Sequence, residues 1–237
     1  MPQPPTRAER HGIIRDALAV GIATGAYGIS FGAVSVTSGL DVWQTCALSL
    51  LVFTGASQFA LVGVIGAGGA PLSGAAAALL LGTRNTLYGL RVAPMIGVHG
   101  WRRYAAAHLV IDESTAMTLP RTTRATARLG FLSTGLSVFV LWNLSTLLGA
   151  AAGEAMGDPR TYGLDAAVGG AFLALVWPRL TDARHRLTAT LGAAVALALV
   201  PMTAAGVPVL AAGVVALGMG LRARSGRIAR PEPEHRP

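Results

Sequence analysis

Residues 42–83 read VWQTCALSLLVFTGASQFALVGVIGAGGAPLSGAAAALLLGT and contain no Asp, Glu, Lys, Arg or His. About 20 apolar residues suffice for a helix to cross roughly 30 Å of hydrocarbon, so this stretch predicts two membrane passes. Within the first pass, residues Thr54 to Phe59 read TGASQF and place polar groups near the middle. Each unpaired amide or hydroxyl at that depth costs several kcal/mol, so something must satisfy these groups.

Charge-free windows cover much of the remaining chain, at Ala17–Leu40, Leu129–Gly153, Ala166–Pro178 and Leu187–Leu221. Hydrophobic residues make up 52% and charged residues 13% of the sequence, and the mean hydropathy is +0.54. These features predict an all-α, polytopic membrane bundle of seven or eight transmembrane helices, some broken or re-entrant. We expect a transmembrane domain at residues 17–221, between a cytoplasmic N-terminal segment (1–16) and a disordered cytoplasmic tail (222–237).

Eight spans are expected, at Ala17–Ser38, Thr45–Gly66, Leu72–Met95, Tyr104–Leu119, Gly130–Gly153, Gly163–Pro178, Leu187–Met202 and Pro208–Leu221. The arginines crowd the ends of these spans, and the positive-inside rule then predicts that both termini are cytoplasmic. The exceptions, which this count places on the opposite side, are Arg91, Arg102, Arg103 and Arg160.

Two of the expected spans are irregular. Leu72–Met95 carries Arg84-Asn85 in its middle and could be two half-helices, whereas Tyr104–Leu119 is short and contains Asp112-Glu113. A re-entrant loop in place of either span gives the alternative count of seven, with one terminus on the other side.

Four polar pairs lie at the expected membrane depth: Ser57-Gln58, Arg84-Asn85, Asp112-Glu113 and Trp142-Asn143. An ionisable residue there costs at least about 2.5 to 3.5 kcal/mol, so it is kept where it is paired or lines a polar cavity. We expect Arg84 opposite Asp112 or Glu113, with Gln58 and Asn85 completing the hydrogen bonds. Adjacent helical residues point about 100° apart, so one carboxylate pairs and the other is left to titrate. A purely structural ion pair is the alternative interpretation.

Several enzyme signatures are absent. The sequence has no Gly-x-x-x-x-Gly-Lys-Ser/Thr phosphate loop and no His-Glu-x-x-His motif, which favours a secondary transporter or its subunit over an enzyme, with no cofactor. His99 and His108 lack a second ligand at helical spacing, which argues against a metal site. The tripeptide Gly39-Leu40-Asp41 recurs as Gly163-Leu164-Asp165, a weak sign of an internal repeat.

Several segments together resemble the AzlC family, the large subunits of bacterial branched-chain amino acid exporters. The most specific is Phe53-Thr54-Gly55-Ala56-Ser57-Gln58-Phe59-Ala60. The others are Gly28-Ile29-Ser30-Phe31-Gly32-Ala33 with Gly39-Leu40, Thr83-Arg84-Asn85-Thr86-Leu87-Tyr88-Gly89 with Ala93-Pro94, Asp112-Glu113-Ser114, and Gly163-Leu164-Asp165 before Phe172-Leu173-Ala174-Leu175. Their order and spacing hold across residues 15–221.

The resemblance implies export of valine, leucine, isoleucine or related apolar amino acids across the bacterial inner membrane. It also implies a small AzlD-type membrane subunit as partner. One departure concerns the family's usual Asn-Leu-Arg-His, where this chain has Gly82-Thr83-Arg84-Asn85. The customary histidine and first asparagine are missing while Arg84 remains, so the substrate range is the property most affected.

A zwitterionic substrate needs a cation or a helix N-terminus for its carboxylate, an acceptor for its ammonium and an apolar pocket. The candidate substrate-binding residues are Gly55, Ser57, Gln58, Arg84 and Asn85. Asp112 and Glu113 are candidates for binding the ammonium or for coupling export to protons, while Phe53 and Phe59 would receive the aliphatic side chain. The rival hypotheses are a non-transporting scaffold for a partner protein and, less favoured, an ion channel.

Overall fold

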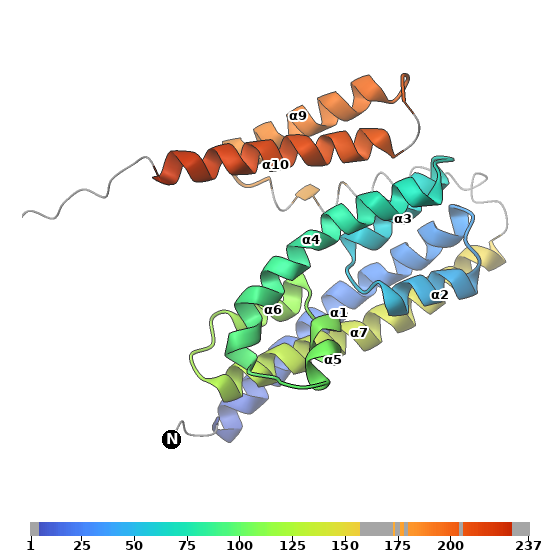
Figure 1. Cartoon of the computed structure of the whole chain (residues 1–237). Helices are drawn as coiled ribbons and strands as arrows, with labels where there is room; N and C mark the ends of the chain where they lie inside the picture. Colours follow the sequence, from blue (N-terminus) through green and yellow to red (C-terminus); the bar gives the residue numbers. More distant parts are fainter. Residues whose placement is uncertain (1–4, 157–172, 174–175, 178–179, 204–205, 229–237) are drawn as a thin grey trace, which may run out of the picture.

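The computed structural model describes residues 5–156, 173, 176–177, 180–203 and 206–228. Every long regular element in those ranges is an α-helix (Figure 1). The helices are α1 (Arg7–Thr37), α2 (Val42–Leu51), α3 (Ala56–Gly66), α4 (Pro71–Ile96), α5 (Arg102–His108), α6 (Asp112–Thr118), α7 (Arg124–Ala155), α9 (Ala183–Leu199) and α10 (Val207–Ile228). Among them, α1 and α7 are long and apolar enough to cross a membrane, judged by length and composition.

Helices α1 and α7 form a closely packed parallel pair. Gly21 of α1 lies against Ser137 of α7, and further along Gly32 lies against Thr146, so the two helices run in the same direction. A Cβ on Gly32 would overlap the carbonyl oxygen of Thr146, and one on Gly149 would overlap a carbonyl oxygen of α1. Small residues permit this backbone contact in a bundle whose surroundings offer no hydrophobic drive for association.

The span expected at Thr45–Gly66 is wrong, because the chain leaves the helix after Leu51 and re-enters it at Ala56. Gly55 adopts φ 62° and ψ −91°, a left-handed conformation that glycine reaches without a Cβ clash. Helix α2 then runs antiparallel to α7, as shown by two contacts: Ser49 Oγ lies 3.4 Å from Thr146 Oγ1, and the rings of Phe53 and Phe139 lie 5.1 Å apart.

Helix α3 carries the chain back to the end where α2 began, since Gly66 packs against Ser38 at the end of α1. Helices α2 and α3 therefore form a hairpin, with its tip at residues 52–55. We call this the first hairpin. A mostly apolar span such as Thr45–Gly66 suits one crossing or one hairpin equally well, and the turn at the tip decides between them.

Helix α4 is continuous over 26 residues, so the prediction that Leu72–Met95 could be two half-helices is also wrong. It lies antiparallel to α3: Gly74 packs against Leu61, and a Cβ on Gly82 would lie 3.6 Å from Ser57 Oγ. At about 1.5 Å per residue, α4 is roughly 39 Å long and reaches from one end of the bundle to the other.

Helices α5 and α6 form a second hairpin, which agrees with the re-entrant alternative for Tyr104–Leu119. Arg128, near the start of α7, donates to the carbonyl oxygens of Ile96 and Gly97 at the end of α4, the latter at 2.6 Å. The chain therefore leaves and returns at the same end of the bundle. Helix α6 runs antiparallel to α7, because Leu109 packs on Gly135 and Met117 on Gly130.

The first two-thirds of the chain thus contain the same arrangement twice, in opposite directions. Helix α1 is followed by the first hairpin at the end that α1 reaches, and α4 is followed by the second hairpin at the opposite end (Figure 1). This is an inverted repeat of a long helix and a hairpin, a pattern common in secondary transporters. Its first unit contains Gly39-Leu40-Asp41, in the turn between α1 and α2, whereas the second tripeptide, at residues 163–165, lies outside the described residues and is not part of this repeat.

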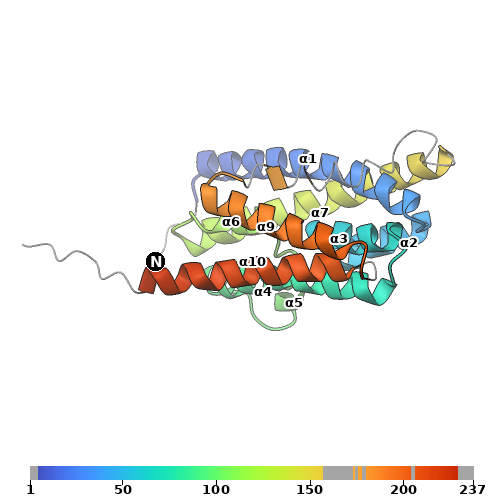
Figure 2. The ribbon, with the colours of Figure 1, turned by 90° about the horizontal axis from the view of Figure 1, so that it is seen from above.

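Helices α9 and α10 occupy the two last expected spans and pack as an antiparallel pair, with Gly192 facing Ala212. Gly206, in the turn before α10, lies against Ser73 at the start of α4. Helix α10 continues past Leu221 to Ile228 and lies along α4, with Gly213 against Leu80 (Figure 2). The span expected at Gly163–Pro178 falls almost entirely outside the described residues.

Candidate functional site

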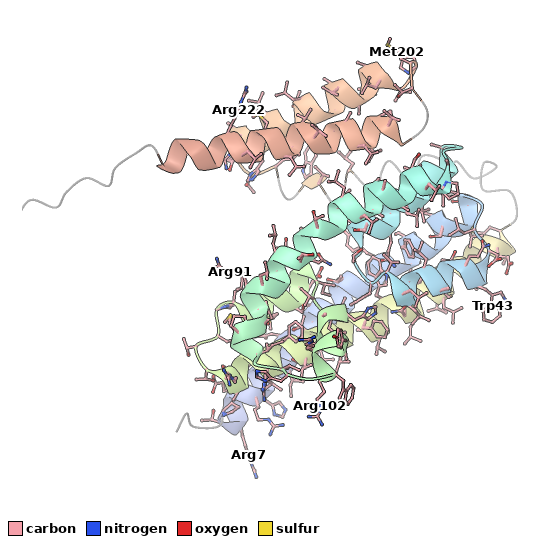
Figure 3. The ribbon with its side chains drawn as sticks, viewed as in Figure 1. Arg7, Trp43, Arg91, Arg102, Met202 and Arg222 are labelled. Carbon is pink, nitrogen blue, oxygen red and sulfur yellow. The ribbon has the colours of Figure 1, made fainter. Side chains whose placement is uncertain are left out.

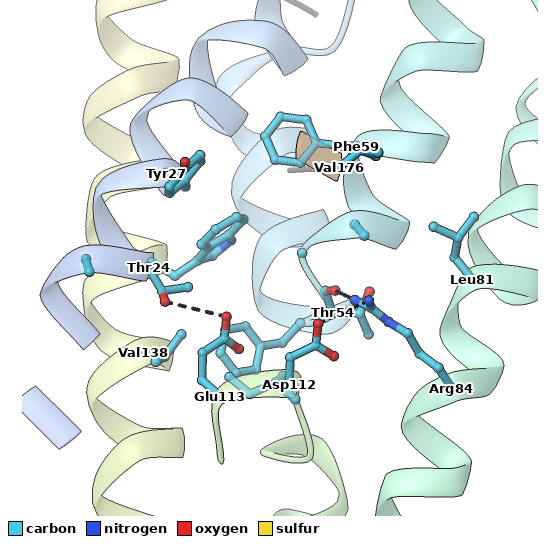
Figure 4. Close-up of a pocket in the computed structure, with 16 residues that line it drawn as sticks. Thr24, Tyr27, Thr54, Phe59, Leu81, Arg84, Asp112, Glu113, Val138 and Val176 are labelled. Carbon is cyan, nitrogen blue, oxygen red and sulfur yellow. Dashed lines mark hydrogen bonds and ion pairs between the residues drawn. The ribbon is translucent and has the colours of Figure 1, made fainter. Parts of the chain in front are cut away.

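The tips of the two hairpins meet inside the bundle and enclose a cavity of about 550 Å³ (Figure 4). Its walls come from α1, the first hairpin, α4, the second hairpin and α7. Among the described residues most of the lining is apolar, and its charged groups are one arginine, Arg84, and two carboxylates, Asp112 and Glu113. A mostly apolar hollow with a few convergent polar groups is the usual form of a small-molecule site.

Arg84 connects the tips of both hairpins. Its Nη1 lies 3.1 Å from Asp112 Oδ2, and its Nη2 donates to the carbonyl oxygen of Thr54 at 3.5 Å. The predicted pairing of Arg84 with one of the two carboxylates is therefore confirmed. The side chains of Arg84 and Asp112 keep 27% and 23% of their surface exposed, so the pair borders the cavity and is not sealed in the core.

Glu113 points to a different wall of the cavity. Its Oε1 accepts a hydrogen bond from Thr24 Oγ1 of α1 at 3.5 Å (Figure 4). The two neighbouring carboxylates thus serve two directions, as the 100° spacing of helical side chains requires. Asp112 binds Arg84 of α4 on one side of the cavity, while Glu113 binds Thr24 of α1 on the other.

Gln58 does not complete the hydrogen bonds of the ion pair, and that expectation is wrong. Its side chain is fully buried; Oε1 accepts from the backbone N–H of Gly55 at 3.1 Å, and Nε2 donates to the carbonyl of Leu48 at 3.4 Å. These bonds hold the first hairpin closed at its tip. A glutamine three residues after a helix start is well placed to bond back in this way.

The structure brings only some of the sequence candidates to the cavity. Gly55, Arg84, Asp112 and Glu113 line it, whereas Ser57, Gln58 and Asn85 are not among the lining residues. Ser57 is buried toward α4, and Asn85 lies beside Arg84 on α4 and does not bond to the ion pair within the described residues.

Sequence reasoning missed four features of the site. Thr24 and Tyr27 line the cavity from the charge-free part of α1, where no local signal marks them. Thr54 contributes its backbone carbonyl, which a side-chain search overlooks. Ser114 closes the second hairpin, accepting from Ile111 N–H at 3.1 Å and donating to the Leu109 carbonyl at 2.6 Å.

Aromatic side chains fix the shape of the cavity wall. Trp142 stacks on Phe31 with ring centroids 6.0 Å apart and meets Phe59 edge-on at 6.5 Å. His108 packs between Phe53 and Phe139, at 6.0 and 5.6 Å, and so joins the tips of both hairpins to α7. Such ring contacts add about 0.5 to 1.5 kcal/mol each beyond area burial and hold the rings in one orientation.

The family model for the AzlC protein matches residues 19–156 of this chain. The chain belongs to the AzlC family. The matched segment covers both hairpins and their supporting helices, that is, every described wall of the cavity except Val176. The family assignment from the sequence segments is therefore confirmed.

One curated relative of this AzlC protein is described only as an uncharacterized membrane protein, from Helicobacter pylori (strain ATCC 700392 / 26695). It is 29% identical over 90 residues, which is 38% of this chain and 40% of the relative. The chain thus aligns with less than half the length of that protein. No solved structure matches.

Proposed function

We propose that this AzlC-family protein is a secondary-transporter subunit that exports branched-chain or related apolar amino acids across the bacterial inner membrane. The observation that carries the proposal is the cavity at the meeting point of two oppositely directed hairpins, whose described lining is mostly apolar and carries one cation and two carboxylates. Transporters of this general design bind substrate at such breaks in the middle of the membrane.

The cavity offers a place for each part of an apolar amino acid. Arg84 can take the carboxylate, aided by the first free amides of α3 near Ala56. Glu113, 3.5 Å from Thr24, can take the ammonium, and Phe53, Phe59 and Leu81 form the apolar wall. When the substrate carboxylate occupies Arg84 it competes with Asp112, and Asp112 and Glu113 are the candidates for coupling export to protons.

The distribution of arginines supports a cytoplasmic location for the end where α1 begins. Because the second expected span, Thr45–Gly66, folds as a hairpin, α4 runs back toward the end where α1 begins and carries Arg91, Arg102 and Arg103 to that side. Arg7 and Arg102 lie toward one end of the bundle and Trp43 toward the other (Figure 3). Three of the four exceptions to the positive-inside rule thereby disappear, and the fourth, Arg160, lies outside the described residues. If the span expected at Gly163–Pro178, outside the described residues, is kept as a crossing, replacing two of the eight expected crossings by hairpins leaves an even number, and we propose that both termini are cytoplasmic.

A small AzlD-type subunit is part of the proposal and rests on the family resemblance. The test is therefore carried out in cells that express both chains. Efflux of radiolabelled valine and leucine is measured with Arg84→Met, which removes the charge but keeps an unbranched side chain. We expect efflux at least tenfold slower, because the carboxylate loses a charged partner worth about 1.5 kcal/mol or more.

Arg91→Met is the matched control, since Arg91 is an exposed arginine on the same helix. Arg84→Met/Asp112→Asn removes both charges and should restore the amount of folded protein without restoring efflux. If the double variant exports valine normally, the ion pair is structural and the cavity is not the site. If every cavity variant leaves export unchanged while the partner subunit fails to accumulate without this chain, the scaffold alternative is correct.

A further inference from the structure

The chain has four tryptophans, and Trp142 differs from the others in its surroundings. Trp43, Trp101 and Trp177 keep 82%, 75% and 69% of their surface exposed, whereas Trp142 keeps 5%. Trp142 also lines the cavity. Its indole Nε1 is buried and has no hydrogen-bond partner in the part of the chain that the structure describes.

The ring cannot turn to find a partner elsewhere. Phe31 stacks against it at an interplanar angle of 25°, and Phe59 meets it at 85°. Phe31 and Phe59 are themselves fully buried and in edge-to-face contact at 5.4 Å. The aromatic cluster therefore fixes the direction of the indole N–H. Native proteins satisfy nearly all buried donors, so a fixed, unpaired donor in a cavity wall indicates that a ligand supplies the acceptor.

We propose that Trp142 is a specificity-determining residue whose indole N–H donates to a carboxylate oxygen of the transported amino acid. The inference rests on the proposed function, because it requires an amino acid in this cavity. An indole N–H is a donor only, so it can bind the carboxylate and cannot accept from the ammonium. Arg84 lines the same cavity, and a carboxylate has two oxygens, one for each donor.

This arrangement divides the recognition of the zwitterion between two kinds of wall. Donors come from Trp142 and Arg84, while the acceptors Asp112 and Glu113 come from the second hairpin. A ligand without a carboxylate leaves the indole N–H unpaired, and a site built to bond a group rejects analogues that lack it. Trp142 thus selects amino acids over alkylamines with the same aliphatic group.

The direct test uses a variant that keeps Trp142 as its only indole, made by Trp43→Phe, Trp101→Phe and Trp177→Phe. The protein is held in lipid nanodiscs, and ultraviolet resonance Raman spectra report hydrogen bonding of the indole N–H. Saturating valine should shift the N–H-sensitive band toward its hydrogen-bonded position, whereas isobutylamine should not. Binding of radiolabelled valine is measured on the same sample.

A second variant tests the consequence for transport. Trp142→Phe keeps an aromatic ring against Phe31 and removes the N–H, so we expect the apparent KM for valine efflux to rise about tenfold or more with little change in the maximal rate. Trp101→Phe is the control, since Trp101 is exposed at the start of the second hairpin and should change neither value. If Trp142→Phe does not accumulate, the Raman measurement decides, because it retains Trp142.

The outcomes separate this inference from the proposed function. If valine binds and the indole band does not move, the role of Trp142 is refuted while the transport proposal stands. An unchanged KM in a well-folded Trp142→Phe protein also refutes it. If radiolabelled valine does not bind even to the unmodified protein, both proposals fail together.

Discussion

The first hairpin closes on Gln58 and the second on Ser114, and the two closures have the same geometry at their cores. In each, a side chain three residues into the returning helix accepts from the backbone N–H at the tip: Gly55 N–H to Gln58 at 3.1 Å, and Ile111 N–H to Ser114 at 3.1 Å. Each side chain also donates to a carbonyl on the other arm, at Leu48 and Leu109 respectively. We call these two side chains, Gln58 and Ser114, the clamps of the hairpins, and both are fully buried.

What differs is the chemistry that the tips present. Gly55, with its neighbours Phe53 and Thr54, gives the cavity apolar surface and backbone groups, whereas the second tip gives it two carboxylates. In each hairpin the side chain of Gln58 or Ser114 satisfies the backbone groups of the turn, so the neighbouring residues at the tip are left for binding. Two equivalent breaks can therefore carry different functional groups without weakening either turn.

The largest effect is expected where both hairpins lose their common support, the α1–α7 pair. Gly149→Ala places a Cβ against the carbonyl of Ile29, and the two helices must separate. We expect a loss of about 3 kcal/mol, the upper part of the range for overpacking. The free energy of unfolding in detergent measures it. Gly89→Ala is the control, because a Cβ on Gly89 meets nothing within 4 Å and should be neutral or stabilising.

Ser114→Ala should cost more than the corresponding change in the first hairpin, about 2 to 3 kcal/mol. It leaves both the Ile111 N–H and the Leu109 carbonyl without the bonds they make to Ser114. Ser133→Ala is a matched control, since Ser133 bonds to a carbonyl within the uninterrupted α7. Equal melting temperatures for the two variants would show that the second tip does not depend on its clamp.

Gln58→Leu is expected to cost about 1 to 2 kcal/mol. Only the Gly55 N–H is stranded, because the Leu48 carbonyl also accepts from Val52 N–H at 2.9 Å. The apparent affinity for valine should be unchanged, since Gln58 does not line the cavity. Gln44→Leu provides the comparison: Gln44 makes the same bond, to Asp41 N–H at 3.0 Å, but on an exposed helix start. A stable Gln58→Leu protein with weakened valine binding would restore Gln58 as a direct ligand.

The smallest effect is expected at Asp182, a carboxylate that caps a helix by a hydrogen bond of the same kind. Asp182 caps α9, and the bond it accepts from the His185 N–H holds its pKa below the ordinary value of 3.8. A depressed pKa stabilises the folded state above the unfolded value, and this stabilisation is lost as the pH falls through the folded pKa. Hydrogen exchange at the start of α9 should therefore accelerate only below about pH 4. Asp182→Asn should abolish that dependence, and the tips closed by Gln58 and Ser114 should show none.

The sequence predicted some parts of this structure because their causes are local. The charge-free stretches correctly located the long apolar helices, and the cost of burying a charge correctly predicted that Arg84 meets a carboxylate. The reversal of the chain at Gly55 was not predicted, because a hydropathy pattern does not show whether an apolar stretch continues or turns back. It depends on a positive φ, on Gln58 and on contacts with α7, a helix that begins about 70 residues later in the chain.

The candidate site was predicted in part for a related reason. Polarity at depth marked Gln58 and Arg84 alike, yet one bonds to its own backbone and the other borders the cavity. A polar residue at membrane depth indicates that it needs a hydrogen-bond or ion-pair partner, but its sequence position does not identify that partner. Thr24 entered the site only because α1 passes beside the second hairpin, a neighbour 89 residues away in the chain.

The bond between Arg84 and Asp112 has a consequence for how the protein is made. Arg84 emerges from the ribosome 28 residues before its carboxylate, and α7, which supports Asp112's hairpin, follows later still. An arginine without a counter-charge is costly in a bilayer, so α4 gains its final position only after the second hairpin and α7 have been synthesised. The cavity is thus completed late in biosynthesis, and a chain that ends between Arg84 and Asp112 carries an arginine without its carboxylate, a defect that quality-control proteases can recognise.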